Sequence, residues 1–273
     1  MGREEGDRIR WIMSEYYKAN RKMGLYDPKS EKPFRVSRTK VDLFLNCQRC
    51  FYLDRKLGVA RPPGFPFSLN SAVDTLLKKE FDIHRANKTA HPLMKSYGVD
   101  AVPLAHPKMD EWRDAITRGV SFLHEPTNFR LTGGVDDIWV NPQGGFIVVD
   151  YKATAKDGEV SLDAPWQIGY KRQMEFYQWL LRKSGFEVSK RGYFVYCNGK
   201  TDRAAFDGKL EFDVVLLPYD GDDSWVEQTI LDAKKCLDGS KIPTAGEACD
   251  YCAYIDAVNK TDIVSGKKQA LLL

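Results

Sequence analysis

Three ionisable side chains in one short stretch are the strongest candidates for chemistry. Asp136 precedes a turn at residues 141–145, and Asp150 and Lys152 follow the apolar run Phe146–Val149. Carboxylates are the ligands that Mg²⁺ and Mn²⁺ prefer, and such an ion lowers the pKa of a bound water. A nearby ammonium can orient that water or neutralise charge on a phosphoryl group. The three side chains therefore predict metal-assisted cleavage of a phosphodiester.

The same pattern has a simpler interpretation. An Asp and a Lys two residues apart occur in many surface hairpins as a solvated ion pair, and such pairs contribute little to stability. Two features favour an active site over a surface pair. One is the earlier acid in Gly-Gly-Val-Asp-Asp, and the other is the apolar run that leads directly into Asp150.

Two strands joined by a turn are expected to position these side chains. Leu131–Val140 is interpreted as the first strand, and Phe146–Tyr151, rich in β-branched residues, as a buried second strand. The Asn-Pro-Gln-Gly-Gly segment between them is typical of a turn. Side chains alternate along a strand, so Asp150 and Lys152 should point to the same face, with Asp136 brought alongside by the hairpin.

Composition and charge are those of an ordinary globular protein. The 273 residues are 43% hydrophobic and 29% charged, which allows one large domain or two small ones. A net charge of +3 neither supports nor excludes binding to nucleic acid. The sequence contains no apolar run of transmembrane length, and its charged N-terminus lacks the apolar core of a signal peptide. We expect a cytoplasmic protein with no membrane association.

Four of the six cysteines form two C-x-x-C pairs near the two ends of the chain: Cys47, Cys50, Cys249 and Cys252. Without a signal peptide, such pairs indicate a metal site before a disulfide framework. By ligand chemistry alone, four thiolates fit zinc at least as well as an iron–sulfur cluster. Cys197 and Cys236 are interpreted as unpaired core thiols.

The order of these motifs resembles a known family. The segments Gly133–Asp136 and Val148–Lys152 are similar to the core motif of the PD-(D/E)XK nuclease superfamily. Gln173 and Tyr177, in a Q-x-x-x-Y pattern, and the paired cysteine motifs narrow the resemblance to its RecB-like branch. That branch includes AddB and CRISPR-associated RecB-like nucleases. The resemblance covers residues 37–254, most of the chain.

The resemblance implies one α/β domain with a restriction-endonuclease-like core, in which helices flank a mixed central sheet. The expected strands are Leu131–Val140, Phe146–Tyr151, Gly192–Tyr196 and Leu210–Leu217. The expected helices are Leu69–Arg85, Trp166–Arg182 and Asp222–Leu237. Residues 1–35 are interpreted as a lead segment with a short helix, residues 36–258 as the nuclease-like domain, and residues 259–273 as a flexible tail.

The resemblance also implies roles for the hairpin. Its Gly-x-x-Asp pattern selects Asp136 as the first metal ligand, which leaves Asp137 solvated or in a supporting position. Asp150 is the second ligand, and the backbone carbonyl of Tyr151 completes the shell. Lys152 assists the attacking water.

The helix expected at residues 166–182 supplies further candidates. Gln173 and Tyr177 are four residues apart and so share one face. Lys171 and Arg172 add positive charge just before them, and the group could hold a phosphate backbone and stack on a base. Without the resemblance, Tyr177 would be interpreted as core and Gln173 as surface. With it, an active-site role is favoured.

In RecB-like nucleases a histidine on the helix expected at residues 69–85 often contributes to the metal site. By position Asp74 stands in its place here, and aspartate is a competent Mg²⁺ ligand. The alternative is an Asp74–Lys78 surface pair at i,i+4. Glu80 and His84 are the other candidates on this helix.

The cysteine pairs depart from the family pattern. RecB-like nucleases often carry a [4Fe–4S] cluster held by one N-terminal and three C-terminal cysteines, whereas this chain has two and two. We favour a [4Fe–4S] cluster, with Zn²⁺ as the alternative. In either case the bound metal is expected to connect the N-terminal helix to the C-terminal region.

The function expected from the resemblance is a Mg²⁺- or Mn²⁺-dependent DNA nuclease. It would act on single-stranded DNA or DNA ends, in DNA repair, recombination or defence. One alternative is a catalytically weak DNA-binding or scaffold protein that keeps the fold, which the missing histidine supports. Another is a nuclease subunit that works with a helicase or recombination partner.

Overall fold

The structure is a computed structural model that describes residues 17, 20–64 and 68–261. Most of the lead segment, including the helix expected there, and the tail from residue 262 lie outside the described residues. Within the described ranges, no helix combines the length and apolar character needed to cross a membrane.

The larger of two sheets carries the candidate site. In spatial order its strands are β2 (Val102–Pro103), β5 (Asp137–Val140), β6 (Phe146–Thr154), β7 (Arg191–Gly199) and β8 (Phe212–Asp220). β6 and β7 run parallel, and the other neighbours are antiparallel. A parallel pair needs a crossover connection, which α6 (Ile168–Lys183) supplies together with the short 3-10 helix η2 (Pro165–Gln167).

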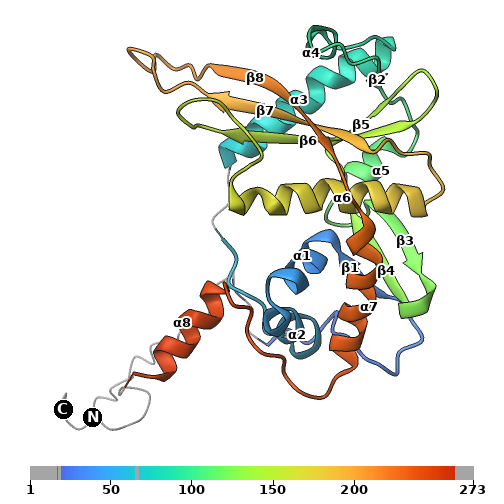
Figure 1. Ribbon diagram of the computed structural model, residues 1–273, viewed down its shortest axis with the longest axis vertical. Coiled ribbons are helices and arrows are strands. Elements are labelled where there is room, and N and C mark those ends of the chain that lie inside the picture. The colour runs from blue at the N-terminus through green and yellow to red at the C-terminus, as the bar shows by residue number, and fades with distance from the viewer. Residues whose placement is uncertain (1–16, 18–19, 65–67, 262–273) are drawn as a thin grey trace, which may run out of the picture.

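A second, three-stranded sheet lies on the far side of α6 (Figure 1). Its order is β1 (Phe34–Ser37), β4 (Phe129–Gly133) and β3 (Val120–His124), with β1 parallel and β3 antiparallel to β4. It is accompanied by α1 (Arg38–Asn46), α2 (Gln48–Leu57) and α7 (Ser224–Asp238). The remaining elements are α4 (Pro92–Ser96), α5 (Met109–Arg113), the 3-10 helix η1 (Glu125–Thr127) and α8 (Asp250–Asn259).

The faces of the larger sheet are covered by different helices. α3 (Ser68–Asn87) packs on one face, and α6 packs on the other. Alternation along β6 follows this division, because Val149 and Tyr151 join the apolar cluster with Phe81 of α3, whereas Val148 joins the cluster with Met174 of α6. The side chains of Asp150 and Lys152 therefore belong to the face covered by α6.

Most of the expected elements are confirmed. The three expected helices correspond to α3, α6 and α7, and the strands expected at residues 146–151, 192–196 and 210–217 correspond to β6, β7 and β8. The last strand does not stop at Pro218 as expected but continues through it to Asp220. β8 is an edge strand of the sheet, the position where a proline within a strand is tolerated.

The expectation of one strand over residues 131–140 in a single sheet was wrong. The segment divides into β4, which belongs to the three-stranded sheet, and β5, which belongs to the larger one. The break falls at Gly133 and Gly134, where the chain passes through a tight space. A Cβ on Gly133 would lie 2.7 Å from Cε1 of Tyr177, and one on Gly134 would lie 2.5 Å from Cβ of Ala115. Asp136 thus lies in the link between the sheets.

Candidate active site

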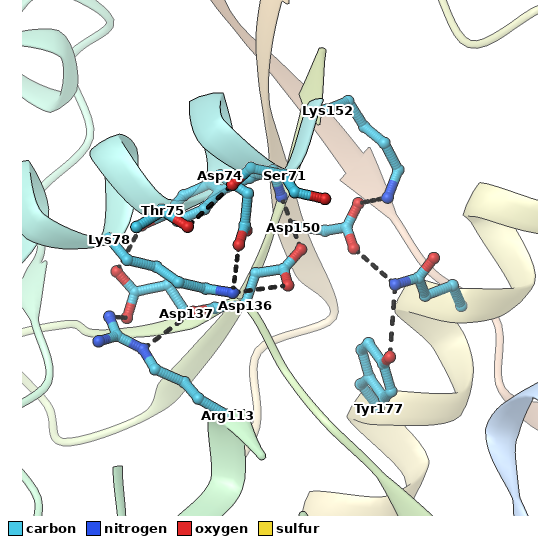
Figure 2. A network of polar contacts seen from close by, with 12 residues as sticks. Ser71, Asp74, Thr75, Lys78, Arg113, Asp136, Asp137, Asp150, Lys152 and Tyr177 are labelled. Carbon is cyan, nitrogen blue, oxygen red and sulfur yellow. Dashed lines mark hydrogen bonds and ion pairs between the residues drawn. The ribbon is translucent and has the colours of Figure 1, made fainter. Parts of the chain in front are cut away.

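Asp150 and Lys152 lie together in the second half of β6, facing α6 (Figure 2). The Asp150 side chain is fully buried, and the Lys152 ammonium contacts its Oδ2 atom. On the other side, Gln173 of α6 donates a hydrogen bond from Nε2 to Asp150 Oδ1 at 2.8 Å. The parallel β6–α6–β7 unit brings these residues together, because the crossover helix packs back over the strand that precedes it.

Asp136 reaches the same place from the link between the sheets. Its Oδ2 atom accepts a hydrogen bond from the backbone N–H of Tyr151 at 3.1 Å, directly beside Asp150. The predicted convergence of Asp136, Asp150 and Lys152 is therefore seen in the structure. The route differs from the expected one, since a turn of the chain between two sheets, not strand alternation, places Asp136.

The pKa of the Asp150 carboxyl is set by its burial and by two neighbouring charges. Burial raises the pKa of its carboxyl, the Lys152 ammonium lowers it, and the carboxylate of Asp136 raises it, with a net pKa of about 7. For Lys152, burial lowers the pKa, but the charges of Asp150 and Asp136 outweigh burial and raise it. Lys152 thus remains an ammonium, while Asp150 titrates near neutrality.

Lys78 was not identified from the sequence as part of this site. Its ammonium lies 2.8 Å from Asp74 Oδ2 and 3.4 Å from Asp136 Oδ1 (Figure 2). Burial lowers the pKa of Lys78, but the charges of Asp136 and Asp74 raise it above its usual value. The i,i+4 spacing signalled the contact with Asp74, whereas nothing in the sequence signalled the contact with Asp136.

Asp74 is therefore near the site but paired with a lysine. Among the described residues, the four cysteines form the one group of three or more Asp, Glu, His or Cys that could hold a metal ion, so three acids are not already assembled around one point. The other two candidates on α3 point elsewhere. Glu80 pairs with His91 at 2.8 Å, and His84 contacts the hydroxyl of Thr89 at 3.1 Å.

Tyr177 lies one turn after Gln173 on α6 and contacts its side chain. Its hydroxyl accepts a hydrogen bond from Gln173 Nε2 at 3.3 Å, and its ring is buried against Gly133. A buried ring has no face free for a nucleic-acid base, so the stacking expected of Tyr177 does not match its position. Its contacts instead hold Gln173 in line with Asp150.

The two cations before Gln173 are directed away from Asp150. Arg172 Nη1 lies 3.1 Å from Asn46 Oδ1 and 3.4 Å from Asp42 Oδ1, both on α1. The ammonium of Lys171 lies 5.9 Å from the centre of the Tyr219 ring on β8. A role in binding nucleic acid remains a prediction for both.

Asp137 occupies the opposite face of the sheet, and it is buried, not solvated. It accepts hydrogen bonds from Arg113 Nη2 at 3.2 Å and from the Tyr151 hydroxyl at 2.8 Å, and it pairs with Arg85. Arg113 also donates from Nε to the backbone carbonyl of Asp136 at 3.1 Å. Because a buried carboxylate needs such partners, this network fixes the backbone that carries Asp136.

The carboxylates fit a hard divalent cation. Asp150 Oδ2 is buried, and the Lys152 ammonium lies against it. A carboxylate oxygen has two lone pairs, so Oδ2 can contact Lys152 and still bind a cation. Oxygen donors are those that Mg²⁺ and Mn²⁺ prefer. Asp136 and Asp150 could therefore hold such an ion.

The two C-x-x-C pairs form a second group, distant in sequence from the hairpin. Sulfur–sulfur distances are 3.8 Å for Cys47–Cys252, 3.6 Å for Cys50–Cys249 and 3.7 Å for Cys50–Cys252, and all four residues are buried. These distances are far longer than a disulfide bond. Burial raises the pKa of Cys47, but N–H groups of Gly246 and Cys50 donate to its sulfur and bring it to about 6.

The remaining two cysteines are unpaired, as predicted. Cys197 is buried in the cluster beneath α3, and Cys236 is half-buried on α7. Burial raises the pKa of each thiol to about 11. Both are therefore inert thiols at neutral pH.

Comparison with known proteins agrees with this geometry. Residues 35–257 match the sequence model of the PD-(D/E)XK nuclease superfamily. The chain belongs to this superfamily. As a PD-(D/E)XK protein it is expected to be a metal-dependent nuclease with DNA as substrate.

Two other comparisons add little to the assignment. No curated protein matched the sequence. A solved structure titled "Crystal structure of SSO0001" aligns with a TM-score of 0.38 and 15% identity, covering 84% of this chain and 87% of that one. The assignment therefore depends on the family match and not on this likeness.

Proposed function

We propose that this chain is a Mg²⁺- or Mn²⁺-dependent nuclease of the RecB-like branch that hydrolyses phosphodiester bonds in single-stranded DNA or at DNA ends. The observation that carries the proposal is the buried contact of Asp150 with both Lys152 and Gln173, beside Asp136. An ion pair on a solvated hairpin would not be buried or held by a third side chain from a helix.

Each side chain has a distinct task in this proposal. Asp136 and Asp150, with the Tyr151 carbonyl, would hold the ion, which when bound supplies Lewis acidity and lowers the pKa of water. Gln173 orients Asp150 by donating to Oδ1, which leaves Oδ2 directed at Lys152. The Lys152 ammonium offers its remaining protons to the attacking water and to the phosphoryl oxygens, where negative charge develops.

Aromatic side chains beside Lys152 support a single-stranded substrate. The Lys152 ammonium lies 4.5 Å from the centre of the Tyr170 ring, and Tyr170 packs edge-on against Trp166 at 5.4 Å. Trp166 lies in η2, directly before α6, and is 63% exposed. Bases that are free of a complementary strand offer open faces to such rings, whereas paired bases do not. Trp166 and Tyr170 are thus better placed for base stacking than Tyr177.

The resemblance to RecB-like nucleases suggests work in DNA repair, recombination or defence, in which a helicase or recombination partner would supply the unwound strand. This part of the proposal concerns the substrate's source and not the chemistry of the site. Copurification of the chain with such a partner would test it.

Replacing Lys152 tests the mechanism. We expect Lys152→Ala to lower the cleavage rate of labelled single-stranded DNA with Mn²⁺ by about 10²- to 10⁴-fold, the effect of losing one charged donor at a developing oxyanion. Lys209→Ala, which removes an exposed lysine from a loop, is the matched control and should cleave normally. Equal cleavage by the wild type and Lys152→Ala would rule the mechanism out.

One observation favours a second candidate function. The Lys78 ammonium lies between Asp74 and Asp136, where it neutralises acids that a catalytic ion would use. A protein that keeps the fold but binds DNA without efficient cleavage would show this arrangement. DNA binding that persists in EDTA, with no cleavage in Mg²⁺ or Mn²⁺, would support this function over the first.

A further inference from the structure

The cysteine group does not have the dimensions that the family's iron–sulfur cluster requires. A [4Fe–4S] cluster places four irons and four sulfides between its thiolates, so each cysteine sulfur lies beyond a separate iron, at a separate corner. Here the four sulfurs all lie within 4.8 Å of one another, and three pairs are 3.6 to 3.8 Å apart. The space between sulfurs at these distances holds one atom and not a cluster.

The same distances agree with a single tetrahedral ion. Four sulfurs bound about 2.3 Å from a central Zn²⁺ stand about 3.8 Å apart along the edges of the tetrahedron. Three of the six edges, at 3.6, 3.7 and 3.8 Å, match this length, and the other three are no longer than 4.8 Å. The pattern of two ligands from each C-x-x-C pair is also that of structural zinc sites.

We propose that Cys47, Cys50, Cys249 and Cys252 bind one Zn²⁺ ion in place of the family's iron–sulfur cluster. This inference does not depend on the proposed nuclease activity, because none of its evidence comes from the hairpin site. All four positions are filled by protein ligands, so the ion has no open position for a substrate and its role is structural.

The surroundings of the sulfurs suit thiolates bound to an ion. Each pair begins a helix, with Cys47 at the N-cap of α2 and Cys249 at the N-cap of α8. In α2 the backbone N–H of Cys50 donates to Cys47 Sγ at 3.4 Å. Gly246 N donates to Cys47 Sγ at 3.2 Å. Arg61 donates from Nη2 to Cys249 Sγ at 3.1 Å and offsets part of the excess negative charge of four thiolates around a divalent ion.

Metal content and absorption decide between the two groups. The full chain is purified without oxygen, its metals are measured by mass spectrometry, and its visible spectrum is recorded. We expect about one zinc per chain, no acid-labile sulfide and a colourless protein. Replacement of zinc by Co²⁺ should produce the visible d–d bands of a tetrahedral tetrathiolate site. A brown protein with about four irons and four sulfides per chain overturns the proposal, and so does a chain that takes up neither Zn²⁺ nor Co²⁺.

Single cysteine substitutions locate the ion. Cys252→Ser should reduce the affinity for Zn²⁺ by about tenfold or more, measured by competition with a chromogenic chelator, because one of four thiolates is lost. Cys236→Ser, which changes a cysteine outside the group, should retain the wild-type affinity. Equal affinities in both variants would show that the ion lies elsewhere and overturn the assignment. Failure of DNA cleavage would leave these measurements unaffected, so the two proposals fail separately.

Discussion

The Lys78 ammonium lies close to the position that a catalytic metal ion would occupy. Its ammonium contacts Asp74 and Asp136 from a half-buried position on α3 (Figure 2). A cation in this position competes with a divalent ion for the same carboxylates. Lys78 should therefore lower the affinity of the site for a divalent ion, which a lysine elsewhere on the surface would not do.

Removing this ammonium should strengthen metal binding. We expect Lys78→Met to bind Mn²⁺ about tenfold more tightly by calorimetry, because a like charge within about 4 Å of the ion costs more than about 1 kcal/mol in a half-buried site. Lys79→Met removes the neighbouring exposed lysine and should leave the affinity unchanged. If Lys78→Met binds Mn²⁺ no better than Lys79→Met, the ion does not approach the Asp74–Asp136 side of the site.

Asp150 should make metal binding depend on pH. Its carboxyl pKa is about 7, above the ordinary value of 3.8, so below pH 7 the ion must displace a proton that the folded protein holds. Affinity for Mn²⁺ should therefore rise about tenfold per pH unit up to about pH 7 and level off above it. Calorimetry in buffers of different ionisation enthalpy measures the released proton. An affinity that is constant from about pH 5.5 to 8 would contradict this assignment.

The residue patterns in the sequence predicted part of this site. Asp150 and Lys152 could be placed on one face because strand alternation depends only on local geometry. The burial of Asp137 and the contact of Lys78 with Asp136 could not be predicted in this way. Both depend on how α3 and the segment before β3 lie over the sheet, which is set by contacts between residues distant in sequence.

At the scale of elements, the passage from β4 to β5 is the feature that brings Asp136 to the site. Two glycines allow the chain to leave one sheet and enter the other while Tyr177 and Ala115 press against it. Sequence reasoning joined the two strands because the apolar pattern continues across the glycines. The partners that require the break, Tyr177 and Ala115, lie elsewhere in the chain, so the pattern alone could not reveal it.

Alanine at two glycines should change stability in opposite directions. A Cβ on Gly134 would lie 2.8 Å from the backbone N of Ala115, so we expect Gly134→Ala to lower the free energy of unfolding by about 1–3 kcal/mol. Gly169 in α6 has open space where its Cβ would be, so Gly169→Ala should raise it by about 0.4–1 kcal/mol. Urea denaturation compares the two, and a stable Gly134→Ala variant would show that this passage is not tightly packed.

At the scale of the whole molecule, the cysteine group joins the two ends of the family match. α8 projects away from both sheets in Figure 1. Besides the sulfurs, Arg61 lies over the Tyr251 ring at 4.7 Å and Arg49 pairs with Asp256 at 3.7 Å. Partly exposed contacts of this kind are weak, so an ion bound by the four sulfurs would be the main attachment of α8.

Loss of one sulfur should therefore loosen α8 without disturbing the sheet. We expect Cys252→Ser to increase hydrogen exchange of the α8 amides by about tenfold or more, while the amides of β6 and β7 exchange as in the wild type. Cys236→Ser serves as the control and should leave both regions unchanged. Mass spectrometry of peptic fragments resolves these segments. Equal protection of α8 in both variants would mean that side-chain contacts alone hold it.

The distance in sequence between the two C-x-x-C pairs also imposes an order in time. The ribosome delivers Cys249 199 residues after Cys50. While the residues between the two pairs are being added, the growing chain carries two of the four thiols, and two thiols hold a zinc ion less tightly than four. An ion bound as proposed would be captured only after translation has passed β8, and a chain terminated before Cys249 would keep an unligated pair of thiols.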